Sequence, residues 1–229
     1  MCVGIKSLCI PGLFVVIQST LQIIKSFTLV AFSLAASVSL TGCFPNDALF
    51  PLKVGNTWVY EAVSPIGKNV RTVKVTGTIP VGSVEGFELD TESGLTDLAW
   101  SNGELLAGKL SGTSFTPPLK MLKESAKEWS WKGKMTTPDG IFDAQASATS
   151  SLEDRTVSDR KVKTVQVTLT IIAQPTTRPS TAPSSNSPAV TSGKKIETIS
   201  WYQRGIGLVG QEQRNDGVLM TKLQYVSGP

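Results

Sequence analysis

Residues 95–110 read LTDLAWSNGELLAGKL, and this stretch decides the fold. Its centre, Asn102-Gly103, is the dipeptide most typical of a two-residue β-hairpin turn, because both residues tolerate a positive φ. The flanking runs, Leu95–Ser101 and Glu104–Leu110, are rich in apolar residues and have the length of strands. The stretch therefore predicts two antiparallel strands joined by a tight turn.

The same pattern recurs along most of the chain. Trp58, Tyr60 and Ala62 alternate with their neighbours at a period of two residues, which is typical of a strand. Residues 119–126 fit one helical turn or none. About ten short strands at hairpin spacing predict an all-β fold, a strongly curved antiparallel meander sheet that forms a half-barrel or a flattened barrel, with little helix outside the signal peptide. A two-sheet sandwich is the alternative. The other predicted strands are Asn69–Ile79, Phe87–Glu92, Glu128–Met135, Ile141–Leu152, Lys161–Ala173, Ile196–Tyr202, Leu208–Gln213 and Val218–Val226.

The composition excludes several kinds of chemistry. The 229-residue chain has no histidine, so a Ser-His-Asp triad and a histidine-ligated metal are excluded. From Cys43 onward there is a single cysteine, which excludes an internal disulfide or a thiolate cluster in that part of the chain. This part holds 20 of the 22 basic residues and all 18 acidic ones, a net charge of +2 that does not indicate a nucleic-acid partner. We expect no metal and no cofactor.

Residues 25–43, KSFTLVAFSLAASVSLTGC, have the three-part plan of a bacterial export signal. Lys25 precedes an apolar stretch from Phe27 to Leu40. The next residues, Leu40-Thr41-Gly42-Cys43, resemble the lipobox of bacterial lipoproteins. The resemblance implies cleavage between Gly42 and Cys43 and lipidation of Cys43 with acyl chains such as palmitate. The alternative is a transmembrane anchor, but the apolar run is shorter than the ~20 residues that a spanning helix needs.

This signal predicts the domain organisation and the location. Residues 1–42 are removed, residues 43–52 form a lipidated tether, and residues 53–229 form one β domain, which leaves a lipid-anchored protein of the cell envelope. Phe44, not Asp, follows the cysteine; resemblance to enterobacterial lipoproteins then implies the outer membrane in a diderm. Residues 1–24 fit either an unusually long signal or a start codon assigned too far upstream.

Residues 175–193, PTTRPSTAPSSNSPAVTSG, differ in composition from the rest of the chain. A segment made mostly of Pro, Ser, Thr and Ala buries too little apolar surface to offset its chain entropy. We predict a disordered loop inserted into a hairpin, which is tolerated because the cost of loop closure grows slowly with length. A glycosylated or wall-contacting segment is the alternative.

Several short motifs match known sites but are better explained by structure. Gly205–Gly210 fits G-x-G-x-x-G, yet no helix follows it, so we predict a glycine-rich bend between antiparallel strands. Ser158–Lys161 and Ser192–Lys195 fit S-x-x-K, but the first is a predicted turn and the second begins in the predicted loop. Among the acids, Glu88, Asp90 and Glu92, with Asp97 close behind, either bind a cation or form a solvated outer face, and the second interpretation needs no further assumption.

The aromatic residues supply the candidate binding surface. All five tryptophans, Trp58, Trp100, Trp129, Trp131 and Trp201, lie in predicted strands. A face made of Trp58, Tyr60, Trp129, Trp131 and Trp201 could hold an apolar ligand. An aromatic core is the favoured interpretation, since aromatic side chains suit half-buried pleated surfaces.

Two segments resemble a known set of sequences. Phe50–Tyr60 reads FPLKVGNTWVY and Trp201–Val209 reads WYQRGIGLV. They are similar to the PLxxGNxWxY opening and the WYxxGxGLV ending of a broad set of uncharacterised bacterial lipoproteins and secreted proteins. The resemblance implies a curved antiparallel sheet, similar in outline to the half-barrels of lipoprotein carrier and receptor proteins. It implies no particular activity.

Together these features predict a membrane-anchored, non-catalytic envelope lipoprotein whose concave face packs a core or holds an apolar ligand or partner. The first alternative is a protein-interaction module of an envelope assembly, which docks through an edge strand or through residues 175–193. A less favoured alternative is a hydrolase that uses carboxylates such as Glu88 or Asp90. We expect no catalytic residues, and the expected partners are the membrane, through the lipid, and a lipid-like ligand or an envelope protein.

Overall fold

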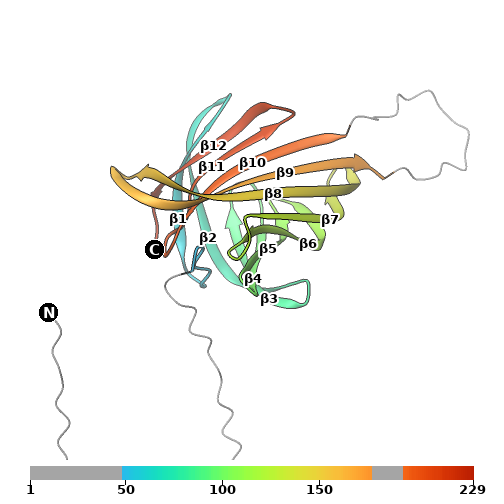
Figure 1. The fold of residues 1–229 in the computed structure, drawn as a ribbon, viewed down its shortest axis with the longest axis horizontal. Helices are drawn as coiled ribbons and strands as arrows, with labels where there is room; N and C mark the ends of the chain where they lie inside the picture. The colour runs from blue at the N-terminus through green and yellow to red at the C-terminus, as the bar shows by residue number, and fades with distance from the viewer. Residues whose placement is uncertain (1–47, 177–192) are drawn as a thin grey trace, which may run out of the picture. The chain divides into compact units, whose positions relative to one another are not determined.

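The computed structural model describes residues 48–176 and 193–229, which form a closed antiparallel β-barrel (Figure 1). Each strand pairs with the next along the chain, and β12 pairs with β1 to close the barrel. The predicted all-β antiparallel meander is confirmed, as a barrel rather than a sandwich. The strands are β1 (Thr57–Ser64), β2 (Gly67–Val81), β3 (Val84–Thr91), β4 (Thr96–Ser101), β5 (Glu104–Leu110), β6 (Thr113–Lys123), β7 (Glu128–Thr137), β8 (Gly140–Val157), β9 (Arg160–Pro175), β10 (Lys194–Gln203), β11 (Gly207–Asn215) and β12 (Val218–Ser227).

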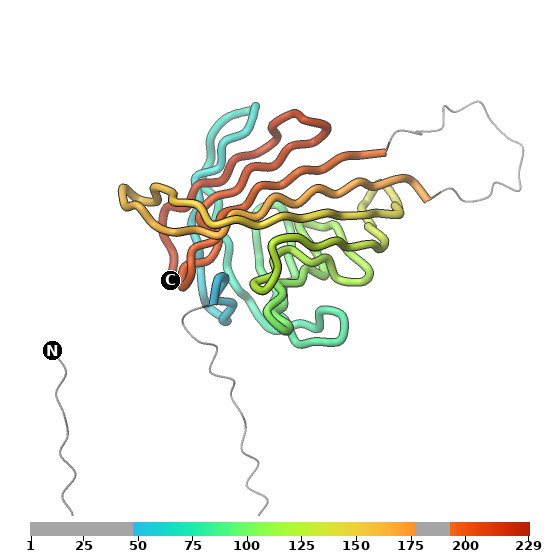
Figure 2. The backbone as a smooth tube through the Cα atoms, viewed as in Figure 1, coloured from blue at the N-terminus to red at the C-terminus, as the bar shows by residue number. Residues whose placement is uncertain are grey.

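Alternating burial shows which face of each strand points inward. On β8, Ala144, Ala146 and Ala148 are buried, while the polar residues between them are exposed. Successive side chains on a strand point to opposite faces, so the apolar set lines the inside of the barrel and the polar set meets water. The connections alternate between the two ends of the barrel because the strands run up and down in turn (Figure 2).

The structure corrects the expected number of strands and the conformation of residues 119–126. There are twelve strands, which are the eleven segments predicted as strands and, in addition, β6 at residues 113–123. Pro117-Pro118 obscured this strand, since proline cannot donate to a ladder. The register of the β5–β6 ladder shifts between Ala107 and Lys109, in the part of β5 that faces the two prolines, and such irregularities tolerate proline. The described residues contain no helix, and therefore none that could cross a membrane.

Two tryptophans bridge β6 and β7 where the backbones of these strands separate. The β6–β7 ladder covers only residues 114–116 of β6. Beyond it, Trp131 Nε1 donates to the carbonyl oxygen of Pro117 at 3.1 Å, and Trp129 Nε1 donates to that of Lys120 at 3.0 Å. A buried indole N–H needs a partner. These two side chains therefore replace the missing ladder hydrogen bonds.

The segment before β1 closes one end of the barrel, which we call the base. Leu49, Phe50 and Leu52 are buried there, although residues 43–52 are predicted as a tether. The Phe50 ring stacks on Trp58, with ring centroids 4.9 Å apart, and meets Tyr202 edge-on at 6.3 Å. We call Leu49–Leu52 the base plug, and its packing makes the base apolar and closed.

Hydrogen bonds hold the base plug in place. Trp100 Nε1 donates to the carbonyl oxygen of Phe50 at 2.8 Å, and the amide of Gly205 donates to that of Ala48 at 2.9 Å. Trp58 Nε1 donates to the carbonyl oxygen of Ile206 at 2.6 Å. The two motifs that bracket the domain in the sequence thus meet at the base, since Phe50 and Trp58 belong to the first and Gly205 and Ile206 to the second.

The β8–β9 hairpin extends past the barrel and packs on its outer surface. Residues Val157, Trp201 and Val209 form a small second core, separate from the barrel interior. The guanidinium of Arg155 lies 3.9 Å from the centroid of the Trp201 ring, and Trp201 Nε1 donates to Glu153 Oε2 at 2.6 Å. These contacts fix Trp201 on the outside of β10.

Candidate ligand-binding cavity

A cavity of about 510 Å³ lies inside the barrel. Phe50 of the base plug forms its floor, and residues of the β3–β4 and β5–β6 connections form the opposite end. Glu92, Ser93 and Ser111 in those connections are exposed, so the cavity reaches solvent there. We call this end the mouth. An interior space of this size fits a barrel with more than the roughly eight strands whose side chains fill the interior.

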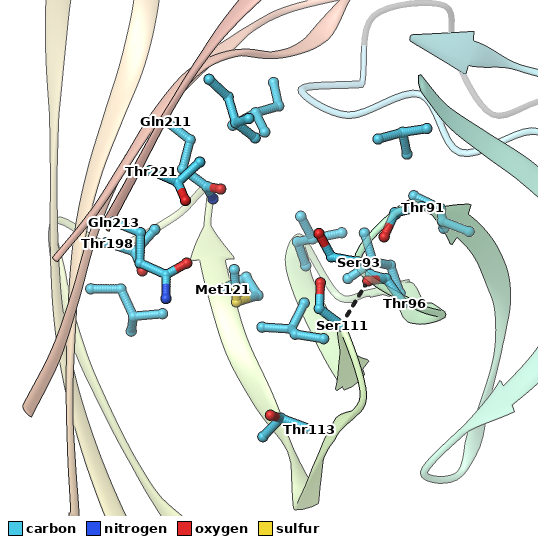
Figure 3. Close-up of a pocket in the computed structure, with 18 of the residues that line it drawn as sticks. Thr91, Ser93, Thr96, Ser111, Thr113, Met121, Thr198, Gln211, Gln213 and Thr221 are labelled. Carbon is cyan, nitrogen blue, oxygen red and sulfur yellow. Dashed lines mark hydrogen bonds between the residues drawn. The ribbon is translucent and has the colours of Figure 1, made fainter. Parts of the chain in front are cut away.

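The lining combines apolar side chains with uncharged polar ones. Several polar side chains from different strands converge on the cavity (Figure 3). A cavity that combines an apolar body with a few placed polar groups is typical of small-molecule sites. The apolar lining residues are Phe50, Tyr60, Val73, Leu89, Leu98, Leu105, Leu110, Phe115, Met121, Met135, Leu169, Ile171, Ile196, Tyr202, Leu208 and Leu223. The uncharged polar ones are Thr91, Ser93, Thr96, Ser111, Thr113, Thr198, Gln211, Gln213 and Thr221.

Local hydrogen bonds order part of the polar lining. Thr96 Oγ1 accepts from the amide of Ser111 at 3.2 Å, which ties the β3–β4 connection to the β5–β6 connection (Figure 3). Gln211 Nε2 donates to the hydroxyl of the buried Ser200 at 3.2 Å. The cavity therefore presents hydroxyl and amide groups from several strands in fixed positions.

Arg71 and Glu92 are the charged residues among those that line the cavity. Arg71 lies on β2, where it pairs across the ladder with Tyr60 of β1. Its Nη1 donates to Ser93 Oγ at 3.4 Å, whereas its Nε is buried and has no hydrogen-bond partner in the described structure. The cavity thus contains one cationic group near the mouth with unused donor capacity.

The tyrosines of the interior are neutral at physiological pH. Burial raises the pKa of Tyr60, and the neighbouring Tyr202 and Tyr225 raise it further. Burial also raises the pKa of Tyr202, to about 12, although a hydrogen bond with Ser200 acts in the opposite direction. Tyr60 and Tyr225 meet edge-on, with ring centroids 6.4 Å apart. These groups therefore add no charge to the cavity.

The structure brings only one residue of the predicted aromatic face to the cavity. Tyr60 lines it, while Trp58 is fully buried beside Phe50 at the base. Trp129 and Trp131 lie on the inner side of β7, but their indoles bridge to β6. Trp201 packs under the β8–β9 hairpin on the outside of the barrel. The predicted set is thus divided among four places.

Of the predicted acidic residues, Glu88, Asp90 and Asp97 lie on the outer face, where Glu88 pairs with Asp97 across the β3–β4 ladder. Glu88 accepts a hydrogen bond from Thr76 Oγ1 at 3.1 Å, and Asp90 is exposed. Glu92 follows the end of β3 and lines the mouth. Burial raises the pKa of Asp97. The positive charge of Lys109 lowers this pKa, and the negative charge of Glu88 raises it further. No group of three metal-binding side chains occurs within residues 48–176 and 193–229.

The remaining motifs lie where the sequence predicts structural roles for them. Gly205 and Gly207 have φ values of +78° and +105° in the bend between β10 and β11, so the glycine motif is a turn between antiparallel strands. Ser158 and Asp159 form the turn between β8 and β9 with positive φ, which places the first S-x-x-K match in a hairpin. Ser192 of the second match lies outside the described residues, as do Gly42, Cys43 and most of the predicted loop at 175–193.

The polar lining of the cavity is absent from the sequence-based site. The alternation of inward and outward residues could have revealed this polar lining. On β10, Thr198 occupies an inward position between Ile196 and Tyr202. Gln211 and Gln213 repeat this pattern on β11. Polar residues at inward positions are unusual for a filled core and typical of a cavity lining.

Comparisons with known proteins return similar structures only. No family model and no curated protein matches the sequence. A protein of Parabacteroides distasonis described as a lipoprotein has 16% identity and a TM-score of 0.49, over 80% of this chain and 99% of that one. An exported protein of Bacteroides fragilis with a YmcC-like fold has 12% identity and a TM-score of 0.45, over 80% and 99%. The hypothetical lipoprotein YmcC of Escherichia coli has 14% identity and a TM-score of 0.38, over 76% and 84%. These values assign neither a family nor a function to this chain.

Proposed function

We propose that the protein is a non-catalytic lipoprotein of the cell envelope that holds an apolar or amphipathic ligand inside its barrel. The observation that supports this function is the cavity of about 510 Å³, lined mainly by apolar side chains with several polar ones among them. Its volume lies within the roughly 300–1,000 Å³ of small-molecule pockets. The ligand site is thus the inside of the barrel rather than a concave face of an open sheet.

The chemistry of the lining supports binding rather than catalysis. Glu92 is the carboxylate among the lining residues, and it is exposed. Hydrolysis by carboxylates generally needs a pair held on either side of the scissile bond. The acids named for a hydrolase, Glu88 and Asp90, are not among the residues that line the cavity. This arrangement offers positions for a bound molecule but no paired acid and base.

The lipid anchor is tested by changing its cysteine. We expect the wild-type protein to incorporate labelled palmitate and to lose its export signal, residues 1–42. Cys43→Ser should remain unlabelled and keep the size of the precursor, because the thiol is the acceptor that the lipobox implies. Cys9→Ser is the matched control and should be labelled like the wild type. Labelling of Cys43→Ser, or an unprocessed wild-type protein in the cytoplasm, would contradict the proposed location.

The ligand is tested by native mass spectrometry of residues 44–229 purified from a bacterial periplasm. Every described strand and core residue lies between positions 48 and 229, so this chain contains the whole barrel. We expect an additional mass that denaturation releases as an apolar or amphipathic molecule. Thr198→Trp should weaken its binding about 5- to 150-fold, because the larger side chain takes up space that the ligand needs, and overfilling costs ~1–3 kcal/mol.

The matched control is Thr170→Trp on the neighbouring strand. Thr170 faces away from the cavity, since Leu169 and Ile171 on either side of it line the interior. It should leave the additional mass unchanged. A wild-type protein that carries no additional mass and binds no added amphiphile would show that the cavity does not serve this function.

The alternative of a protein-interaction module stays a prediction. Docking through an edge strand needs a strand with a free side, and every described strand pairs on both sides in the closed barrel. Docking through residues 175–193 concerns a segment that lies mostly outside the described residues. No feature of the described barrel favours this alternative over the ligand-binding function.

A further inference from the structure

The cavity contains one cation that the barrel leaves without a counter-ion. Arg71 lines the cavity, yet none of the ion pairs among the described residues includes it. Its hydrogen bond is the 3.4 Å contact with the hydroxyl of Ser93, a neutral partner at long range. A guanidinium carries five N–H donors, so most of the donor capacity of Arg71 is unused.

The buried Nε of Arg71 is the most informative of these donors. It is shielded from solvent and has no partner among the described residues. A charged donor buried without a partner costs free energy, so such a group is retained where something else pairs with it. Nε and a terminal nitrogen of a guanidinium lie side by side and match the two oxygens of a carboxylate. This geometry favours an oxyanion as the missing partner.

The surroundings of Arg71 define the rest of the ligand. Below it, toward the base, lie Val73 on the same strand and the apolar lining that ends at Phe50. Beside it at the mouth is the hydroxyl of Ser93. Glu92 also lines the mouth, and its carboxylate repels negative charge. A second negative charge on the head group would add to this repulsion without a second cation to offset it. The site therefore combines an apolar chamber with a place for a single negative charge.

We infer that the ligand is an amphiphile with one anionic oxyanion head group, such as an aliphatic carboxylate, and that Arg71 binds this head group. The inference rests on the proposed function, because it names the class of ligand for the same cavity. The aliphatic chain occupies the apolar part above Phe50. The head group pairs with Nε of Arg71 and lies close to the Ser93 hydroxyl.

The experiment compares dodecanoate with dodecanol, which share a chain and differ in the head group. Their affinities for residues 44–229 are measured by isothermal titration calorimetry below micelle formation. We expect dodecanoate to bind about 10- to 100-fold more tightly, which is the effect of a charge-assisted hydrogen bond. Dodecyl phosphate should bind more weakly than dodecanoate at a pH where it is dianionic, because Glu92 repels the second charge.

Substitution of Arg71 localises the effect. Arg71→Gln should remove the preference for dodecanoate and leave the affinity for dodecanol unchanged, and Arg71→Lys should keep part of the preference. Arg214→Gln is the matched control, since Arg214 also has a buried Nε without a partner but lies on the outer face beside Glu212, 3.6 Å from its carboxylate. This control should bind both compounds like the wild type.

The outcomes separate this inference from the proposed function. If the wild-type chain binds neither compound, the proposed function fails and the inference fails with it. If both compounds bind with equal affinity, the cavity binds apolar ligands but the role of Arg71 is overturned. Because the wild-type comparison needs no variant, the result stands even if Arg71→Gln does not fold.

Discussion

We expect Phe50→Ala to lower the free energy of unfolding by about 3–5 kcal/mol, the cost of deleting a large buried ring. The Phe50 side chain is 5% exposed and stacks on Trp58, which is fully buried. It also meets Tyr202 edge-on, so its removal leaves a void among three aromatic rings. Urea denaturation of the 44–229 chain, followed by tryptophan fluorescence, measures the effect.

The control for this prediction is Ile66→Ala. Ile66 is 99% exposed in the β1–β2 turn, and truncation there should change stability by less than about 0.5 kcal/mol. If Phe50→Ala unfolds at the same urea concentration as the wild type, Leu49–Leu52 contributes no stability and the base of the barrel is not closed by packing. The unfolding curves should retain their slope, because the variant exposes the same surface on unfolding.

The second large effect is expected for Gly207→Ala, with a loss of about 2–5 kcal/mol. Gly207 has a φ of +105°, a conformation that side chains rarely adopt and that costs ~1–2 kcal/mol in an L-residue. A Cβ atom at this position would also overlap the Phe50 ring and approach Trp58 Nε1 to 3.3 Å. Overfilling adds ~1–3 kcal/mol. The same denaturation measurement detects the loss.

A second glycine separates backbone strain from overlap. Gly217 has a φ of +85°, and a Cβ atom there would meet nothing within 4 Å. Gly217→Ala should therefore show the strain alone, and the difference between the two variants measures the overlap with Phe50. In a double variant with Phe50→Ala, the combined loss should be smaller than the sum of the single losses, because the ring that causes the overlap is absent. Strict additivity would mean that Gly207 and Phe50 do not contact each other.

The strands themselves were largely predictable from the sequence. Alternation is a local signal, so Trp58, Tyr60 and Ala62 reveal the inward face of β1 without knowledge of its partners, and all three are buried. Asn102-Gly103 likewise specifies its own turn, in which both residues have a positive φ. Each signal lies within the few residues that it predicts.

The closure of the barrel and the cavity in its interior were not predictable in the same way. Closure depends on β1 pairing with β12, and the partners Val59 and Ser227 lie at opposite ends of the domain. Alternation shows which side chains point inward but not whether they fill the space between them. The aromatic residues illustrate the limit, because Trp201 is buried by the β8–β9 hairpin, which covers the outside of the barrel.

The base plug also determines which end of the barrel lies next to the N-terminal segment. The chain enters the barrel at its closed end, since Ala48 bonds to Gly205 in the β10–β11 turn, while the mouth lies at the other end. Ala48 lies five positions after Cys43, and five residue steps reach at most about 18 Å. A lipid on Cys43 would therefore hold the closed end near the bilayer and leave the mouth facing the aqueous compartment. If the barrel holds the proposed ligand in that orientation, the ligand would enter and leave on the side that faces away from the anchoring membrane.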